Sequence, residues 1–163
     1  MTGYMTFEFD MEFKSQKKDF WKDFVAMSDY FSHAILPMQQ QFGVRSEDLL
    51  YSLGRLIGAK AAKTYSKLSL EETLHELQKV WKEHEIGRLE IDGKSPLQIT
   101  IHDCTICGQL AGTGGMFDCA FHEGFFGGIL SAKENRNVQL TKMTNFEGGG
   151  GTWCRKYTAD ISL

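Results

Sequence analysis

The 163-residue chain has two prolines, four cysteines and no apolar run near the roughly 20 residues that a membrane-spanning helix needs. Its 18 basic and 21 acidic residues are mixed along the sequence. Phosphate binding needs clustered lysine and arginine, so we expect no direct nucleic-acid contact. The first ten residues lack the basic start and apolar core of a signal peptide. These absences predict a chain without a membrane segment, located in the reducing cytoplasm.

Motifs for nucleotide phosphates are also missing, because no glycine-rich stretch matches GxxxxGK[ST], or GxGxxG between a strand and a helix. The few cysteines are grouped. Cys104, Cys107 and Cys119 lie between His102 and Gly124, and Cys154 follows a second glycine-rich stretch. In a reducing compartment a Cys-x-x-Cys pair indicates metal or redox chemistry more often than a structural disulfide.

The length is that of one domain, so we predict a single domain over residues 1–163. Within it, residues 1–45 are expected to supply an N-terminal strand and a helix. Residues 7–13 alternate apolar and polar side chains, which is typical of a strand, and Phe20, Phe24, Met27 and Phe31 recur at helical spacing. Residues 46–163 form the expected core of the domain.

Two helices are predicted early in this core. The first has Ser46 as its expected N-cap and carries Gly54 and Gly58 on one face. Each internal glycine costs a helix roughly 1 kcal/mol relative to alanine, so we expect another backbone to approach closely there. The second helix opens with a capping box formed by Ser69 and Glu72.

The rest of the chain predicts strands around one more helix. Residues 88–102 read as a hairpin that turns at Asp92-Gly93. Residues 117–134 are expected to be a tightly packed helix, since they contain Gly124, Gly127 and Gly128. Strands over 138–143 and 153–163 flank a glycine-rich turn. Together these elements predict an α+β fold, a mostly antiparallel sheet covered by helices.

Three segments carry a family resemblance. Residues 49–62 contain a tyrosine followed by Gly-Arg-x-x-Gly, residues 119–130 a cysteine followed by a glycine-rich helix, and residues 138–157 a closing hairpin with a glycine turn and a cysteine. In this order they resemble the 4-vinyl reductase (vinyl-4-reductase) domain family, from Ser46 to the C-terminus. That family shares its α+β ligand-binding fold with heme-NO-binding domains and with subunits of the TRAPP tethering complex.

The resemblance implies a domain that binds a small, often hydrophobic molecule and is frequently a homodimer. In family members that sense aromatic compounds, a structural zinc is held by three cysteines and a glutamate. Cys119 and Cys154 match two of those positions, while Lys142 and Asn145 stand where the family has its glutamate and middle cysteine.

The cysteines allow three interpretations. Cys104 and Cys107 would complete a zinc site with Cys119 and Cys154, and His122, one helical turn after Cys119, is a possible substitute. Alternatively, Cys104 and Cys107 form a reversible disulfide. As a third interpretation, the cysteines are small buried hydrophobes, which suits Cys119 best.

We therefore predict a binding or sensor domain for a small, hydrophobic molecule, with a structural zinc. The aromatic side chains that would line an apolar pocket, or would otherwise be plain core, are Tyr51, Phe117, Phe121, Phe125, Phe126 and Trp153. Two alternatives are a reductase acting on a vinyl tetrapyrrole, as the family's name suggests, and a protein-interaction scaffold. No acid/base pair stands out, so no catalytic residue is predicted.

Overall fold

A computed structural model describes residues 20–26, 34, 37, 40–42, 44–104, 120–143, 155–161 and 163. Its elements are α2 (Val44–Thr64), α3 (Leu70–Glu83), β1 (Arg88–Asp92), β2 (Leu97–His102), α5 (Ala120–Glu134), β3 (Thr141–Lys142) and β4 (Arg155–Ala159). Residues 20–26 are also helical. The predicted α+β class is confirmed.

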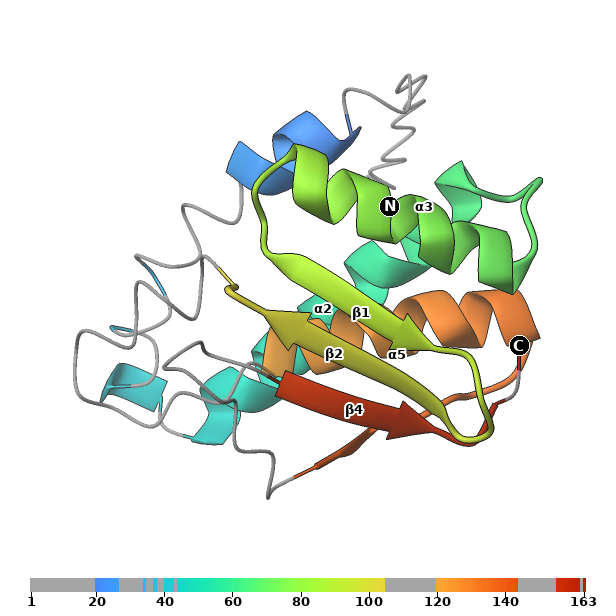
Figure 1. The fold of residues 1–163 in the computed structure, drawn as a ribbon. Coiled ribbons are helices and arrows are strands. Elements are labelled where there is room, and N and C mark those ends of the chain that lie inside the picture. The colour runs from blue at the N-terminus through green and yellow to red at the C-terminus, as the bar shows by residue number, and fades with distance from the viewer. Residues whose placement is uncertain are drawn as a thin grey trace, which may run out of the picture.

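The four strands form one antiparallel sheet in the order β1-β2-β4-β3. Helices α2 and α5 pass behind the strands in Figure 1, so one face of the sheet is turned to the helices. Ile99 of β2 pairs with Tyr157 of β4, and both side chains are fully buried. Glu90, Thr100 and Lys156 follow one another in register on the opposite phase. The alternation read from the sequence therefore assigns the two faces correctly.

Helices α2 and α5 pack backbone against backbone. A Cβ added at Gly124 would lie 2.9 Å from the carbonyl carbon of Tyr51, and one at Gly58 would lie 2.9 Å from that of Phe125. Gly54 and Gly128 make equivalent approaches from their own helices. The predicted close approach at the paired glycines is confirmed. Glycines of α2 lie against the backbone of α5, and glycines of α5 lie against the backbone of α2.

Arg55 holds this helix pair to the chain that follows α5. Its guanidinium donates to Ser131 Oγ at 2.9 Å, to the carbonyl of Val138 at 3.1 Å and to Asn137 Oδ1 at 3.1 Å. It also donates to the hydroxyl of Tyr51 at 3.3 Å. The arginine between Gly54 and Gly58 is thus a structural anchor, a role that the sequence alone did not reveal.

The helical segment 20–26 belongs to the same core. Trp21 and Phe24 are buried, and the indole N–H of Trp21 donates to the hydroxyl of Tyr65 at 2.8 Å. This hydrogen bond connects the segment to the end of α2. The helical spacing read around Phe20 and Phe24 is confirmed here, whereas the strand predicted at residues 7–13 lies outside the described residues.

The ends of the predicted elements differ from the structure in two places. The prediction of Ser46 as an N-cap is wrong, because α2 already begins at Val44. The strand predicted over residues 138–143 is only Thr141–Lys142. By contrast, the capping box of α3 is confirmed: Glu72 N donates to Ser69 Oγ at 3.1 Å and Ser69 N donates to Glu72 Oε2 at 2.7 Å.

Candidate functional site

Cys104 and His122 meet in the core. Cys104 comes two residues after β2, and His122 lies in the first turn of α5. Cys104 is 3% exposed and His122 is 0% exposed. The Cys104 Sγ lies 4.0 Å from both ring nitrogens of His122, so it favours neither. The start of α5 and the end of the hairpin thus bring a thiol and an imidazole together, away from water.

These are two of the five residues predicted as zinc ligands. Cys107, Cys119 and Cys154 lie outside the described residues, and among the residues that are described no three metal-ligating side chains form a group. Two ligands of one tetrahedral zinc, a sulfur and a nitrogen, would lie about 3.6 Å apart. A sulfur that shares a zinc with one ring nitrogen would lie clearly farther from the other nitrogen, so the equal separations of Cys104 from both nitrogens of His122 are those of a packed pair.

Three other ionisable side chains, His102, Lys142 and Glu123, have surroundings of their own. His102 Nε2 lies 3.0 Å from Glu90 Oε2, and the Glu90 side chain is about half exposed. Lys142, which the sequence resemblance aligned with a zinc-binding glutamate, pairs with Tyr157 in the sheet. Glu123 follows His122 on α5, and burial raises the pKa of its carboxyl above the usual 4.5.

Aromatic side chains gather beside the Cys104–His122 pair. We call them the aromatic cluster; its members are Trp21, Phe24, Trp81, Phe121, Phe125 and Phe126, all buried. Phe121, Phe125 and Phe126 were predicted as pocket lining or core, and the structure places them in the core. Tyr51 stands apart, beside Arg55, while Phe117 and Trp153 lie outside the described residues.

Trp81 is the member of the cluster with an unusual feature. It is 0% exposed, and its Nε1 has no hydrogen-bond partner within the described part of the chain. A buried donor without an acceptor costs about 1–3 kcal/mol. Sequence reasoning used Trp81 only as part of an apolar stripe, and periodicity cannot reveal whether an indole N–H finds an acceptor.

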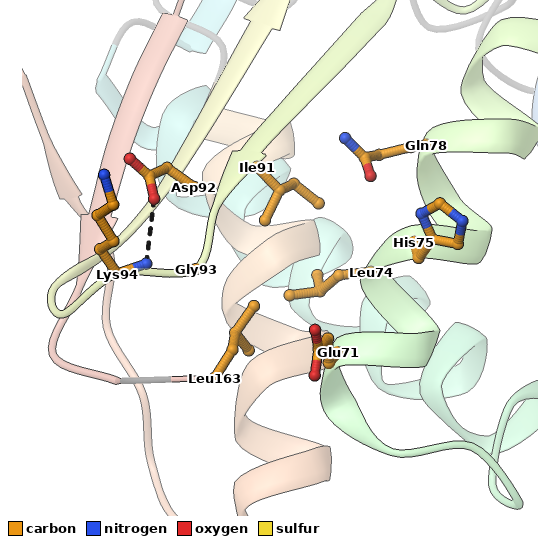
Figure 2. Close-up of a pocket in the computed structure, with 9 residues that line it drawn as sticks. All are labelled: Glu71, Leu74, His75, Gln78, Ile91, Asp92, Gly93, Lys94 and Leu163. Atoms are coloured by element: carbon orange, nitrogen blue, oxygen red, sulfur yellow. Dashed lines mark hydrogen bonds between the residues drawn. The ribbon is translucent and has the colours of Figure 1, made fainter.

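A separate cleft lies between α3 and the β1–β2 hairpin (Figure 2). It has a volume of about 460 Å³. Leu74 and Ile91 form its apolar floor, with Leu163 beside them. His75 lies on the helix side, and Lys94 lies at the hairpin turn. The cleft has the size of a small-molecule pocket, but its rim is charged and open to water.

Hydrogen bonds fix the cleft at both sides. Gln78 Nε2 donates to the carbonyl of Leu89 at 3.1 Å, which joins α3 to the edge of β1. Asp92 Oδ1 accepts from the backbone N–H of Lys94 at 3.1 Å, which shapes the turn. Leu163 N donates to the carbonyl of Gly93 at 3.3 Å. The sequence did not indicate this cleft, because its walls come from three separate segments.

Comparison with known proteins places the fold. No family model matches the chain. An uncharacterized protein of Methanocaldococcus jannaschii is 28% identical over 118 residues, which are 72% of this chain and 67% of that protein. The crystal structure of the phenol-responsive sensory domain of the transcription activator PoxR with phenol has a TM-score of 0.60 and 14% identity. The match covers 82% of this chain and 74% of that one.

At this identity the likeness to the PoxR domain shows a shared α+β fold and nothing finer. The 4-vinyl reductase family remains a resemblance carried by the motifs around Gly54, Gly124 and Cys154. None of the described helices is long and apolar enough to cross a membrane.

Proposed function

We propose that this protein is a binding or sensor domain for a small, hydrophobic molecule. One observation carries the proposal: the aromatic cluster borders the buried Cys104–His122 pair, where β2, α3 and α5 converge. Ligand pockets combine apolar and aromatic walls with a few polar groups, and this region has both. The fold shared with a domain described as phenol-responsive supports the same proposal.

Native mass spectrometry of the purified protein tests this function directly. We expect a small molecule bound to the intact protein, or, for protein purified empty, a rise in melting temperature with phenol or another small aromatic compound. A ligand at one hundred times its Kd should add about 2.7 kcal/mol of stability. A protein that carries no ligand and whose stability no aromatic compound changes would contradict the proposal.

We propose further that the four cysteines hold a structural zinc. We also propose that the protein works in the cytoplasm, where the thiols stay reduced. Cys104, Cys107, Cys119 and Cys154 would be the ligands, with His122 as a possible substitute for one of them. The support for this set is that the fold brings two of its members, Cys104 and His122, side by side in the core. When bound, zinc would add binding free energy to folding and would fix the start of α5 to the end of β2.

Metal analysis with thiol titration tests the zinc site. We expect one zinc per chain and reduced thiol reactivity until a chelator is added. A His122→Ala variant should lose zinc affinity if the imidazole is a ligand, whereas His75→Ala, in the open cleft, should keep it. Protein that contains no zinc and in which all four thiols react would contradict the zinc site. The redox and packing interpretations of the cysteines would then remain.

A homodimer through α2 is the third part of the proposal. Leu49 is 56% exposed and Leu56 is 63% exposed, and a spacing of seven residues puts both on one side of this helix. Exposed leucines at this spacing are typical of an association surface. Light scattering after size exclusion should show a dimer that Leu56→Glu dissociates. The control Glu83→Lys, an exposed charge change on α3, should leave it intact, and a monomeric wild type would refute the dimer.

A further inference from the structure

We propose that a second site, at the C-terminal end of α5, binds a small organic molecule through its carboxylate group. The site is an open cavity of about 430 Å³, a volume typical of small-molecule pockets. Its walls come from α2, from α5 and from the chain that follows α5. It shares no residue with the aromatic cluster or with the Cys104–His122 pair, so this inference is independent of the binding function proposed above.

The residues that line this cavity carry two positive charges and no negative one. Arg55 and Arg136 both line it, and no carboxylate does. The four groups that accept hydrogen bonds from Arg55 are a hydroxyl of tyrosine, a hydroxyl of serine, a backbone carbonyl and an amide oxygen, all neutral. No described carboxylate forms an ion pair with Arg55. The guanidinium of Arg55 is therefore held in place without a carboxylate to neutralise it.

Arg136 keeps donors that no described residue uses. Its Nη2 donates to the carbonyl of Asp160 at 2.9 Å. Its Nε lies 3.9 Å from Glu134 Oε2, which is too long for a hydrogen bond. Nη1 has no acceptor among the described residues, and the side chain is 52% exposed. Arg136 can therefore turn its guanidinium to a molecule in the cavity without giving up a short ion pair.

Arg55 also fixes the orientation of a neutral donor. Its Nη2 donates to Asn137 Oδ1 at 3.1 Å. Only the oxygen of an amide group can accept a hydrogen bond, so this contact turns the NH2 group of Asn137 away from Arg55. No described residue accepts from that NH2 group, and Asn137 lines the cavity. A fixed amide donor beside two guanidinium groups suits an acceptor with a negative charge.

The balance of charge favours a monoanion with an apolar body. Near the two guanidinium groups lie the Glu134 carboxylate and the C-terminus of α5, which carries about half a negative charge. About half a positive charge is left, which is too little for a doubly charged phosphate. Ala59, Gly128 and Ala132 also line the cavity, and their small apolar surfaces leave room for a hydrocarbon body. A planar carboxylate matches the fork of a guanidinium group.

Benzoate and benzamide test the requirement for charge, because they have nearly the same shape and only benzoate is negative at pH 7. We expect calorimetry to show benzoate binding about tenfold more tightly than benzamide, the effect of one charged hydrogen bond. Arg136→Gln should weaken benzoate binding about tenfold. The matched control Arg88→Gln makes the same change of charge at an arginine that is 61% exposed and also lies beside a glutamate, and it should leave the affinity unchanged.

A spectroscopic measurement on the wild type locates the bound molecule. In protein labelled with ¹⁵N at asparagine, the side-chain NH2 resonances of Asn137 should move with benzoate and stay in place with benzamide. Raising the salt concentration should weaken the binding of benzoate, because the site is open to water.

Three results would overturn this site. They are equal affinities for benzoate and benzamide, wild-type affinity for benzoate in Arg136→Gln, and equal losses in Arg136→Gln and Arg88→Gln, which would assign the effect to net charge alone. Inorganic phosphate that binds more tightly than benzoate and moves the Asn137 resonances would overturn the carboxylate as the ligand class. None of these results bears on the function proposed above, because the aromatic cluster contains neither Arg136 nor Asn137.

Discussion

An alanine at Gly128 should weaken the protein, whereas an alanine at the neighbouring Gly127 should not. A Cβ at Gly128 would lie 3.0 Å from both the carbonyl carbon of Arg55 and the backbone nitrogen of Ala59. A Cβ at Gly127 would meet Arg55 Nη1 at 3.4 Å and the carbonyl of Val138 at 3.6 Å, which are ordinary contacts. The two substitutions therefore differ in what the new methyl group touches and in little else.

The magnitude follows from these distances. Carbon atoms in contact normally lie about 3.5–4.0 Å apart, so a methyl group at Gly128 requires α2 and α5 to separate by about 0.5–1 Å. Overpacking of this kind costs about 1–3 kcal/mol, and the better helix propensity of alanine returns up to about 1 kcal/mol. Gly127→Ala gains the propensity without the clash. Because both variants gain the same propensity, they should differ by the overpacking cost, about 1–3 kcal/mol in the free energy of unfolding.

Urea and thermal unfolding of both variants beside the wild type would measure this difference. For a chain of this size it corresponds to about 2–12 °C in Tm. Unchanged m-values would show that the folded state, rather than the unfolded ensemble, carries the effect. If Gly128→Ala is as stable as Gly127→Ala, the backbone contact between α2 and α5 is not as close as described, and the reasoning is refuted.

Four further predictions concern polar groups. Arg55→Lys should lower the free energy of unfolding by about 2 kcal/mol or more in urea titrations, because a lysine cannot replace the four bonds of the guanidinium. Ser69→Ala should cost about 1 kcal/mol through the lost N-cap. The backbone N–H and side chain of Ser69 hold the pKa of Glu72 below its usual 4.5. The stability that the ionised Glu72 carboxylate contributes through these hydrogen bonds is therefore lost as the pH falls below 4.5. In Glu72→Gln, Tm should no longer show this loss at acid pH. Burial raises the pKa of Glu123, so the folded state binds this proton more readily than the unfolded state and loses stability as the pH rises above 4.5. Glu123→Gln should therefore raise Tm relative to the wild type at pH 7 and leave it unchanged at pH 3. A variant with the wild-type Tm at both pH values would contradict this.

Local patterns in the sequence predicted much of the fold. The alternation around Leu97 and Ile99 placed β2 and its buried face, and the spacing of Ser69 and Glu72 placed the start of α3. The paired glycines predicted close backbone contact at Gly54 and Gly58 because glycine inside a helix needs a compensating reason. These successes share a cause: each depends on residues only a few positions apart.

The features that the sequence did not reveal depend on partners far along the chain. Arg55 binds groups 76 to 83 residues away, and the N–H of Trp21 finds Tyr65 while that of Trp81 finds no acceptor among the described residues. Ser46 was misjudged because a good N-cap residue is also tolerated inside a helix, and the chain continues helically before it. The zinc ligands, the reductase alternative and the scaffold alternative remain predictions.

The glycine contact between α2 and α5 also constrains how a bound molecule could be reported to the surface. Helices that meet through side chains can slide, because the side chains change rotamer as they pass one another. Here Gly58 and Gly124 leave no room even for a methyl group between the backbones of α2 and α5, so few side chains at this contact can change rotamer. We therefore expect α2 and α5 to move as one unit, so that a shift of Phe125 on α5 would also shift Leu56 on the outer surface of α2.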